Sequence, residues 1–156
     1  MLNRLRQLFR DDSNADGGAR STGEVQLATA ALLVEMIRAD GIIEDSEITT
    51  VRRILRERFS LAPGDLDALM HEADRAVDDA VEFHAFAAAI NKHFDAASKT
   101  QMIECMWRVA YADGEKDMLE EHLIRRIAEI LYVPHHAFIQ ARRQVESELD
   151  KESSKR

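Results

Sequence analysis

The chain has 156 residues, enough for one domain with a sizeable buried core. Hydrophobic residues make up 46% of it but aromatic residues only 6%, and it has two prolines and six glycines. This scarcity of strand-forming and turn-forming residues favours an all-helical protein. The formal net charge of −8 argues against nucleic acid as the main partner, because phosphate-binding surfaces are basic.

The sequence has the character of a cytoplasmic protein. Cys105 has no second cysteine with which to form an internal disulfide, which fits a reducing compartment. Residues 1–10, MLNRLRQLFR, carry charges throughout and lack the apolar stretch of a secretory signal. No run of about 18 apolar residues predicts a membrane span. We therefore expect a cytoplasmic location.

The first 23 residues are expected to stand apart from the domain. Residues 1–10 predict a short basic amphipathic helix, in which Leu2, Leu5, Leu8 and Phe9 share one side. Such a helix can make weak contact with a membrane surface, although packing on the domain is the simpler interpretation. Residues 11–23 are rich in Gly, Ser and Asp and predict a flexible linker.

The helical domain is expected over residues 24–148, followed by a charged, fraying tail over 149–156. Ser21 with Glu24, and Ser98 with Gln101, have the spacing of capping boxes that open helices. Pro63 and Pro134 have the character of first-turn prolines that open two more. Residues 79–94 are apolar almost all round, which predicts a central, largely buried helix.

An internal repeat organises this domain. The tripeptide Ala-Asp-Gly occurs at 39–41 and again, 73 residues later, at 112–114, and apolar positions such as Val51 and Ile124 agree at the same offset. Each copy is expected to run helix, acidic turn, helix, proline turn, helix. The predicted fold is a compact all-α bundle of about seven core helices. It has two pseudo-symmetric three-helix repeats around the apolar helix, plus the short N-terminal helix.

Two interpretations of the acidic turns stay open. In the structural one, each glycine ends a helix in the left-handed conformation, and Asp117 with Glu120 forms a capping box worth about 1 kcal/mol. In the functional one, the turns are cation half-sites. Asp-Gly followed by Glu matches part of a calcium-binding EF-hand loop, but Met36 and Val109 stand where its first carboxylate is needed, so a true EF-hand is rejected.

If the repeat brings the two turns together, their carboxylates would share one weakly bound Ca²⁺ or Mg²⁺. Clustered carboxylates repel one another and raise each other's pKa, which a cation would relieve. The predicted metal ligands are the three acids of each turn: Asp40, Glu44, Glu47, Asp113, Asp117 and Glu120.

The paired Ala-Asp-Gly turns with their downstream acids, within three-helix repeats joined by an apolar helix, resemble the tellurite-resistance TerB-like family over about residues 24–148. The resemblance implies an all-helical domain that occurs alone, beside chaperone J domains or in stress-response operons. It also implies metal binding by the six acids named above. The chain lacks the His-Pro-Asp signature of a J domain, so it is not a complete co-chaperone.

Catalysis is not expected. The six histidines form neither HExxH nor a Cys/His zinc pattern, and the surroundings of Cys105 predict a small buried hydrophobe. A metal-dependent hydrolase using the same carboxylates is the enzymatic alternative, without a recognisable nucleophile. We expect a non-catalytic, stress-linked module that binds a divalent cation and another protein. The alternative is a metal-independent interaction or scaffold module in which the acidic turns are only helix caps.

Overall fold

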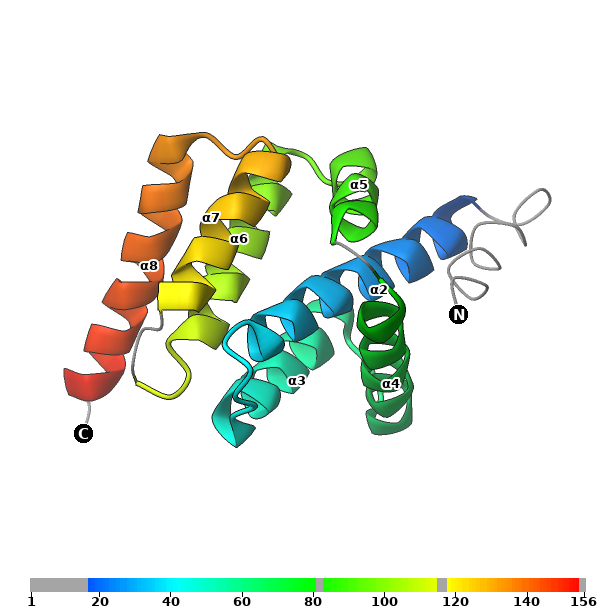
Figure 1. The fold of residues 1–156 in the computed structure, drawn as a ribbon, viewed down its shortest axis with the longest axis horizontal. Coiled ribbons are helices and arrows are strands. Elements are labelled where there is room, and N and C mark those ends of the chain that lie inside the picture. Colours follow the sequence, from blue (N-terminus) through cyan, green and yellow to red (C-terminus); the bar gives the residue numbers. More distant parts are fainter. Residues whose placement is uncertain (1–16, 81–82, 115–117, 155–156) are drawn as a thin grey trace.

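The computed structural model describes residues 17–80, 83–114 and 118–154, and this part of the chain is an all-α bundle without strands. The predicted all-helical fold is confirmed. None of the helices described is both long and apolar enough to cross a membrane. Figure 1 shows the seven helices, which are α2 (Gly17–Arg38), α3 (Asp45–Phe59), α4 (Pro63–Asp79), α5 (His84–His93), α6 (Ala96–Ala110), α7 (Met118–Ile130) and α8 (His135–Ser154).

Two helices, α2 and α6, carry most of the core. α2 packs against α3, α4, α5, α6 and α7, and its residues Ala30 to Leu33 are completely buried. α6 packs against α3, α7 and α8 and buries Met102, Met106 and Trp107. Each of these helices leads directly into one of the Ala-Asp-Gly turns. Their mutual contact therefore decides where the two turns lie relative to each other.

Several predicted boundaries differ from the structure. α2 begins at Gly17, inside the predicted linker over 11–23, so Ser21 and Glu24 lie within a helix instead of opening one. Glu24 is buried and pairs with His93 of α5, with 2.9 Å between Oε2 and Nε2. This pair ties the early part of α2 to the core, which the local composition did not indicate.

The second predicted capping box and the predicted tail also differ. Asp95 caps α6, and its carboxylate accepts the backbone N–H of Ser98 at 2.8 Å. Asp is as good an N-cap as Ser, and it stands where the chain is still extended. α8 continues through 149–154 to Ser154, whose hydroxyl donates to the Asp150 carbonyl at 3.0 Å.

The apolar segment over 79–94 is divided in two. α4 ends at Asp79 and α5 spans only His84–His93, while Val81 and Glu82 lie outside the described residues. α5 buries Phe86, Ala87, Ala89 and Ile90 against the bundle but exposes Ala85 and Ala88. Short alanine side chains on the outer face explain why the sequence is apolar on all sides of this helix.

The two Ala-Asp-Gly turns have matching backbones. Gly41 has φ +79° and Gly114 has φ +84°, both in the left-handed region. The Gly41 N–H donates to the Arg38 carbonyl at 3.1 Å, and the Gly114 N–H donates to the Tyr111 carbonyl at 3.0 Å. The same sequence therefore ends α2 and α6 in the same conformation.

Replacing either turn glycine with alanine should lower stability. Gly41→Ala and Gly114→Ala should each lower the free energy of unfolding by about 1–2 kcal/mol, because an L side chain is strained at positive φ. No neighbouring atom would touch the added methyl group, so the loss is conformational. Chemical denaturation measures it. Gly64→Ala is the matched control, because Gly64 lies in the first turn of α4 with open space around it. An equal loss in the control would contradict this explanation.

Candidate functional site

The first acidic turn is followed by a buried glutamate, Glu47. Asp40 holds the turn, since its Oδ1 accepts the Ile42 N–H at 2.9 Å. Glu44 is the last extended residue before α3, and its side chain makes no capping hydrogen bond. Glu47, in the first turn of α3, is only 1% exposed. A carboxyl group at this position is favoured by the helix dipole, but its burial is costly.

The second acidic turn is likewise followed by a buried glutamate, Glu120. This residue lies in the first turn of α7 and is 2% exposed. Its side chain hydrogen-bonds to that of Glu47. Figure 1 shows the start of α7 beside the turn from α2 to α3. The two acidic turns therefore meet, and two carboxyl groups from positions 73 residues apart share one contact.

The meeting point concentrates negative charge on Glu47. Burial, followed by repulsion from Asp40, Asp113 and Glu44, raises the pKa of Glu47 from its ordinary 4.5 to about 7, and only the hydrogen bond with Glu120 opposes this. Oε2 of Glu47 is buried without a hydrogen-bond partner. We call these five residues the acidic junction: Asp40, Glu44, Glu47, Asp113 and Glu120.

The junction brings together five of the six predicted ligands. Glu47 and Glu120 touch, and the charges of Asp40, Glu44 and Asp113 act on Glu47. Asp117, the sixth, lies outside the described residues. Within residues 17–80, 83–114 and 118–154, no three His, Cys, Asp or Glu side chains stand close enough together to hold a metal ion. Carboxylate oxygens are the ligand type that Ca²⁺ and Mg²⁺ require, so the junction fits either ion in the type of its donors but not in their spacing.

Helix capping accounts for only part of this arrangement. Asp40 has a local role, because it satisfies a backbone N–H of its own turn. Glu44 does not cap α3, and Oε2 of Glu47 accepts nothing. The two acids downstream of Gly41 are therefore not placed as a capping box would place them.

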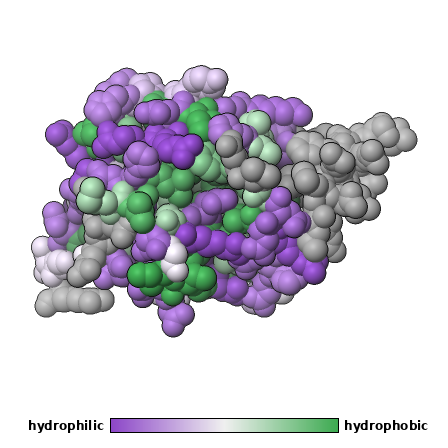
Figure 2. Space-filling model, in the orientation of Figure 1, coloured by the Kyte–Doolittle hydropathy of each residue, from purple (hydrophilic) through white to green (hydrophobic). Residues whose placement is uncertain are grey.

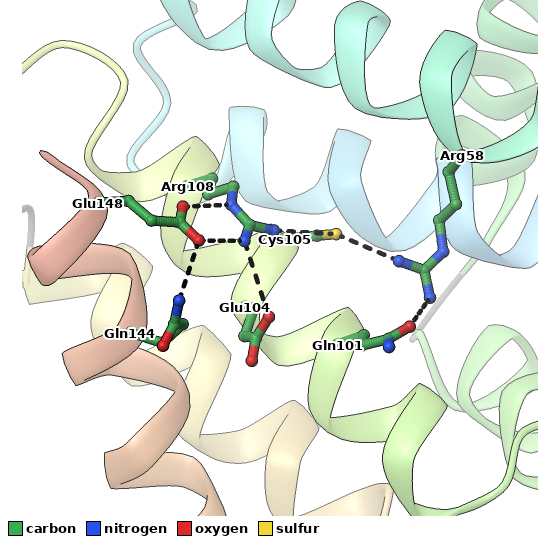
Figure 3. A network of polar contacts seen from close by, with 7 residues as sticks. All are labelled: Arg58, Gln101, Glu104, Cys105, Arg108, Gln144 and Glu148. Carbon is green, nitrogen blue, oxygen red and sulfur yellow. Dashed lines mark hydrogen bonds and ion pairs between the residues drawn. The ribbon is translucent and has the colours of Figure 1, made fainter. Parts of the chain in front are cut away.

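Sequence reasoning missed a second polar site, in a cleft of about 610 Å³ formed by α3, α6 and α8. Figure 3 shows Arg58 and Arg108 on either side of the Cys105 thiol, with the Arg guanidinium groups 3.7 Å and 3.9 Å from the sulfur. Glu148 of α8 receives two hydrogen bonds from Arg108, at 2.9 Å and 3.0 Å. The contacts of Cys105 with Arg58 and of Arg108 with Glu148 join residues 40 or more positions apart, so no local pattern announces them.

Cys105 remains a thiol in this cleft. Burial raises its pKa, and the nearby Arg58 and Arg108 charges only partly oppose that shift. The thiolate is the nucleophilic form, so a raised pKa makes the sulfur unreactive. The residue is 3% exposed, which confirms its predicted burial.

Two comparisons with known proteins found a match to this chain. A family model described as "Tellurite resistance protein TerB" matches residues 26–143. A crystal structure titled as a protein of unknown function, PG1108 from Porphyromonas gingivalis W83, aligns with a TM-score of 0.60 and 23% identity, over 80% of this chain and 95% of that one. It supports the fold alone. No curated protein matches the sequence.

The pKa of Glu47 predicts how stability changes with pH. Because the pKa of Glu47 is higher in the folded chain than in the unfolded chain, the folded chain holds the proton more tightly. This contribution to stability is complete below about pH 4.5 and is lost as the pH rises through about 7. With a chelator present, Glu47→Gln should therefore be more stable than the wild type at about pH 8, by on the order of 2 kcal/mol, and should gain little at about pH 5.

Urea unfolding at the two pH values measures this difference. Glu57→Gln is the matched control, because Glu57 lies exposed on the same helix and loses the same charge. The gain in stability should be absent there. A Glu47→Gln variant whose advantage over the wild type is the same at both pH values would contradict the raised pKa.

Proposed function

This chain belongs to the tellurite-resistance TerB family, and on that premise we propose that its acidic junction binds a divalent cation. The ion would be Ca²⁺ or Mg²⁺, held weakly by the carboxylates of both turns: Asp40, Glu44, Glu47, Asp113, Asp117 and Glu120. We propose a non-catalytic cytoplasmic module that couples this cation to a protein partner in a stress response.

One observation carries the proposal. Oε2 of Glu47 is buried without a hydrogen-bond partner, in a place where three further carboxylates repel its charge. Burying an ionised carboxylate without a partner destabilises the folded chain by on the order of several kcal/mol, because the charge is removed from water. A bound cation would replace this repulsion with attraction and supply the missing partner. Binding would draw the carboxylates closer together than they lie without it.

The alternative is a metal-independent interaction module, and one contact favours it. Asp40 uses its carboxylate oxygen to hold its own turn, which is a structural role. In this alternative Glu47 and Glu120 share a proton, and the folded chain keeps the pair stable without an ion. Cation titration separates the two functions, because a proton-sharing pair would bind neither Ca²⁺ nor Mg²⁺ at neutral pH.

The test is titration of the full chain with Ca²⁺ and with Mg²⁺ by calorimetry at about pH 8, where Glu47 is ionised. We expect one ion per chain and a rise in melting temperature that grows with ion concentration. Glu47→Gln with Glu120→Gln should abolish both signals. Asp40→Asn with Asp113→Asn should weaken binding, while the amide oxygen introduced at position 40 would still accept the Ile42 N–H.

The control is Glu57→Gln with Glu129→Gln, which removes two exposed charges from the same two helices. It should bind the ion as the wild type does. No heat and no thermal shift in the wild type would leave the metal-independent module as the function. Equal binding by the junction and control variants would move the ion elsewhere on the acidic surface.

A further inference from the structure

Large apolar side chains are exposed beside both acidic turns. Ile42 is 60% exposed, Ile43 61%, Met118 82% and Leu119 57%. They are four of the six exposed large hydrophobic residues in the part of the chain that the structure describes. Figure 2 shows apolar side chains at the surface along the lower edge, where the turn from α2 to α3 lies in Figure 1. Exposed apolar side chains on two segments that adjoin the same pair of turns mark an interaction surface.

These four residues come from two separate segments that meet at the junction. Ile42 and Ile43 lie just before α3, and Met118 and Leu119 are the first two residues of α7. The hydrogen bond between Glu47 and Glu120 holds the first turns of α3 and α7 against each other. We call the four residues the junction patch: Ile42, Ile43, Met118 and Leu119.

The surroundings of the junction patch are acidic. Glu44 and Asp45 are exposed directly after Ile43, and Asp113 is exposed in the second turn. Arg38, the cation nearest the first turn along the chain, is engaged by Asp74 and Asp78 of α4. An apolar centre with an acidic border fits a segment in which leucines alternate with arginines.

The chain itself contains a segment of this composition. Residues 1–10, MLNRLRQLFR, place Leu2, Leu5, Leu8 and Phe9 at helical spacing among three arginines and carry no acid. We propose that residues 1–10 of a second copy of this chain dock on the junction patch. The arginines face the acidic border and the apolar side chains cover the patch.

Chain length favours a second copy over the same one. α2 has 22 residues, so Gly17 and the junction lie about 33 Å apart along its axis. Residues 11–16 span at most about 21 Å when fully extended. The segment of the same copy would reach the patch only with this stretch drawn taut along α2. A segment donated to the next copy needs no such extension and joins the copies head to tail.

The first arm of the test measures self-association of the full chain by sedimentation velocity over a range of concentrations, with chelator present. We expect dimers or larger species that dissociate at high salt, because the contact is partly ionic. Ile42→Ser with Ile43→Ser should leave monomers. Arg4→Glu with Arg6→Glu and Arg10→Glu should do the same. Tyr132→Ser is the control, because Tyr132 is 80% exposed in the turn that follows the C-terminal end of α7.

The second arm measures binding of a fluorescent synthetic peptide of residues 1–10 to the full chain by anisotropy. The Ile42→Ser, Ile43→Ser variant should bind it about tenfold more weakly than the wild type or the Tyr132→Ser control. Thermal unfolding checks that each variant is folded. Because chelator is present, failure here is distinct from failure of cation binding.

Three results would overturn the proposal. Association that persists in the charge-reversed chain would assign the contact to another surface. A peptide that binds the patch while the full chain stays monomeric at all concentrations would overturn the assignment to a second copy. Binding of the peptide to anionic lipid vesicles but not to the chain would make residues 1–10 a membrane contact instead.

Discussion

The arrangement of this domain depends on how two buried carboxyl groups are accommodated where its two acidic turns meet. Glu47 and Glu120 are each almost completely buried, and each lies in the first turn of a helix that follows an Ala-Asp-Gly turn. Ionising Glu47 is costly, because its burial and the charges of Asp40, Asp113 and Glu44 oppose it. Their hydrogen bond, and the raised pKa of Glu47, are the response of the folded chain to that cost. Loss of the proton from this pair would therefore be accompanied by binding of a cation or by a rearrangement of the turns.

The helices α2 and α6 impose this meeting. They pack against each other through fully buried residues, and each leads into a turn that glycine closes with positive φ. Because the two turns match and their helices are packed together, α3 and α7 begin close to each other. The first turn of each faces the core. The other acids of the two turns are exposed because they lie in the short connections between one helix and the next.

The fold was largely predictable from the sequence, and the reasons are local. Helical spacing of apolar residues, two Ala-Asp-Gly turns and Pro63 were enough to predict an all-helical bundle and the approximate place of most helices. The start of α2 was predicted wrongly, because a long-range contact overrides the local pattern there. Glu24 lies inside α2 and pairs with His93, 69 residues away, although its spacing from Ser21 suggests a cap. The pairs across the α3, α6 and α8 cleft, such as Arg108 with Glu148, were unpredictable for the same reason.

The junction reverses the usual placement of side chains, and this reversal is what helix capping does not explain. Two carboxyl groups lie inside, while isoleucine, methionine and leucine side chains lie outside within a few residues of them. Capping accounts for Asp40 and for the glycines, but it requires neither the burial of Glu47 nor the exposure of Ile42 and Ile43. Stability alone favours the opposite arrangement at each of these positions. Local rules are broken in both directions at one place, and in folded proteins such places are where function is found.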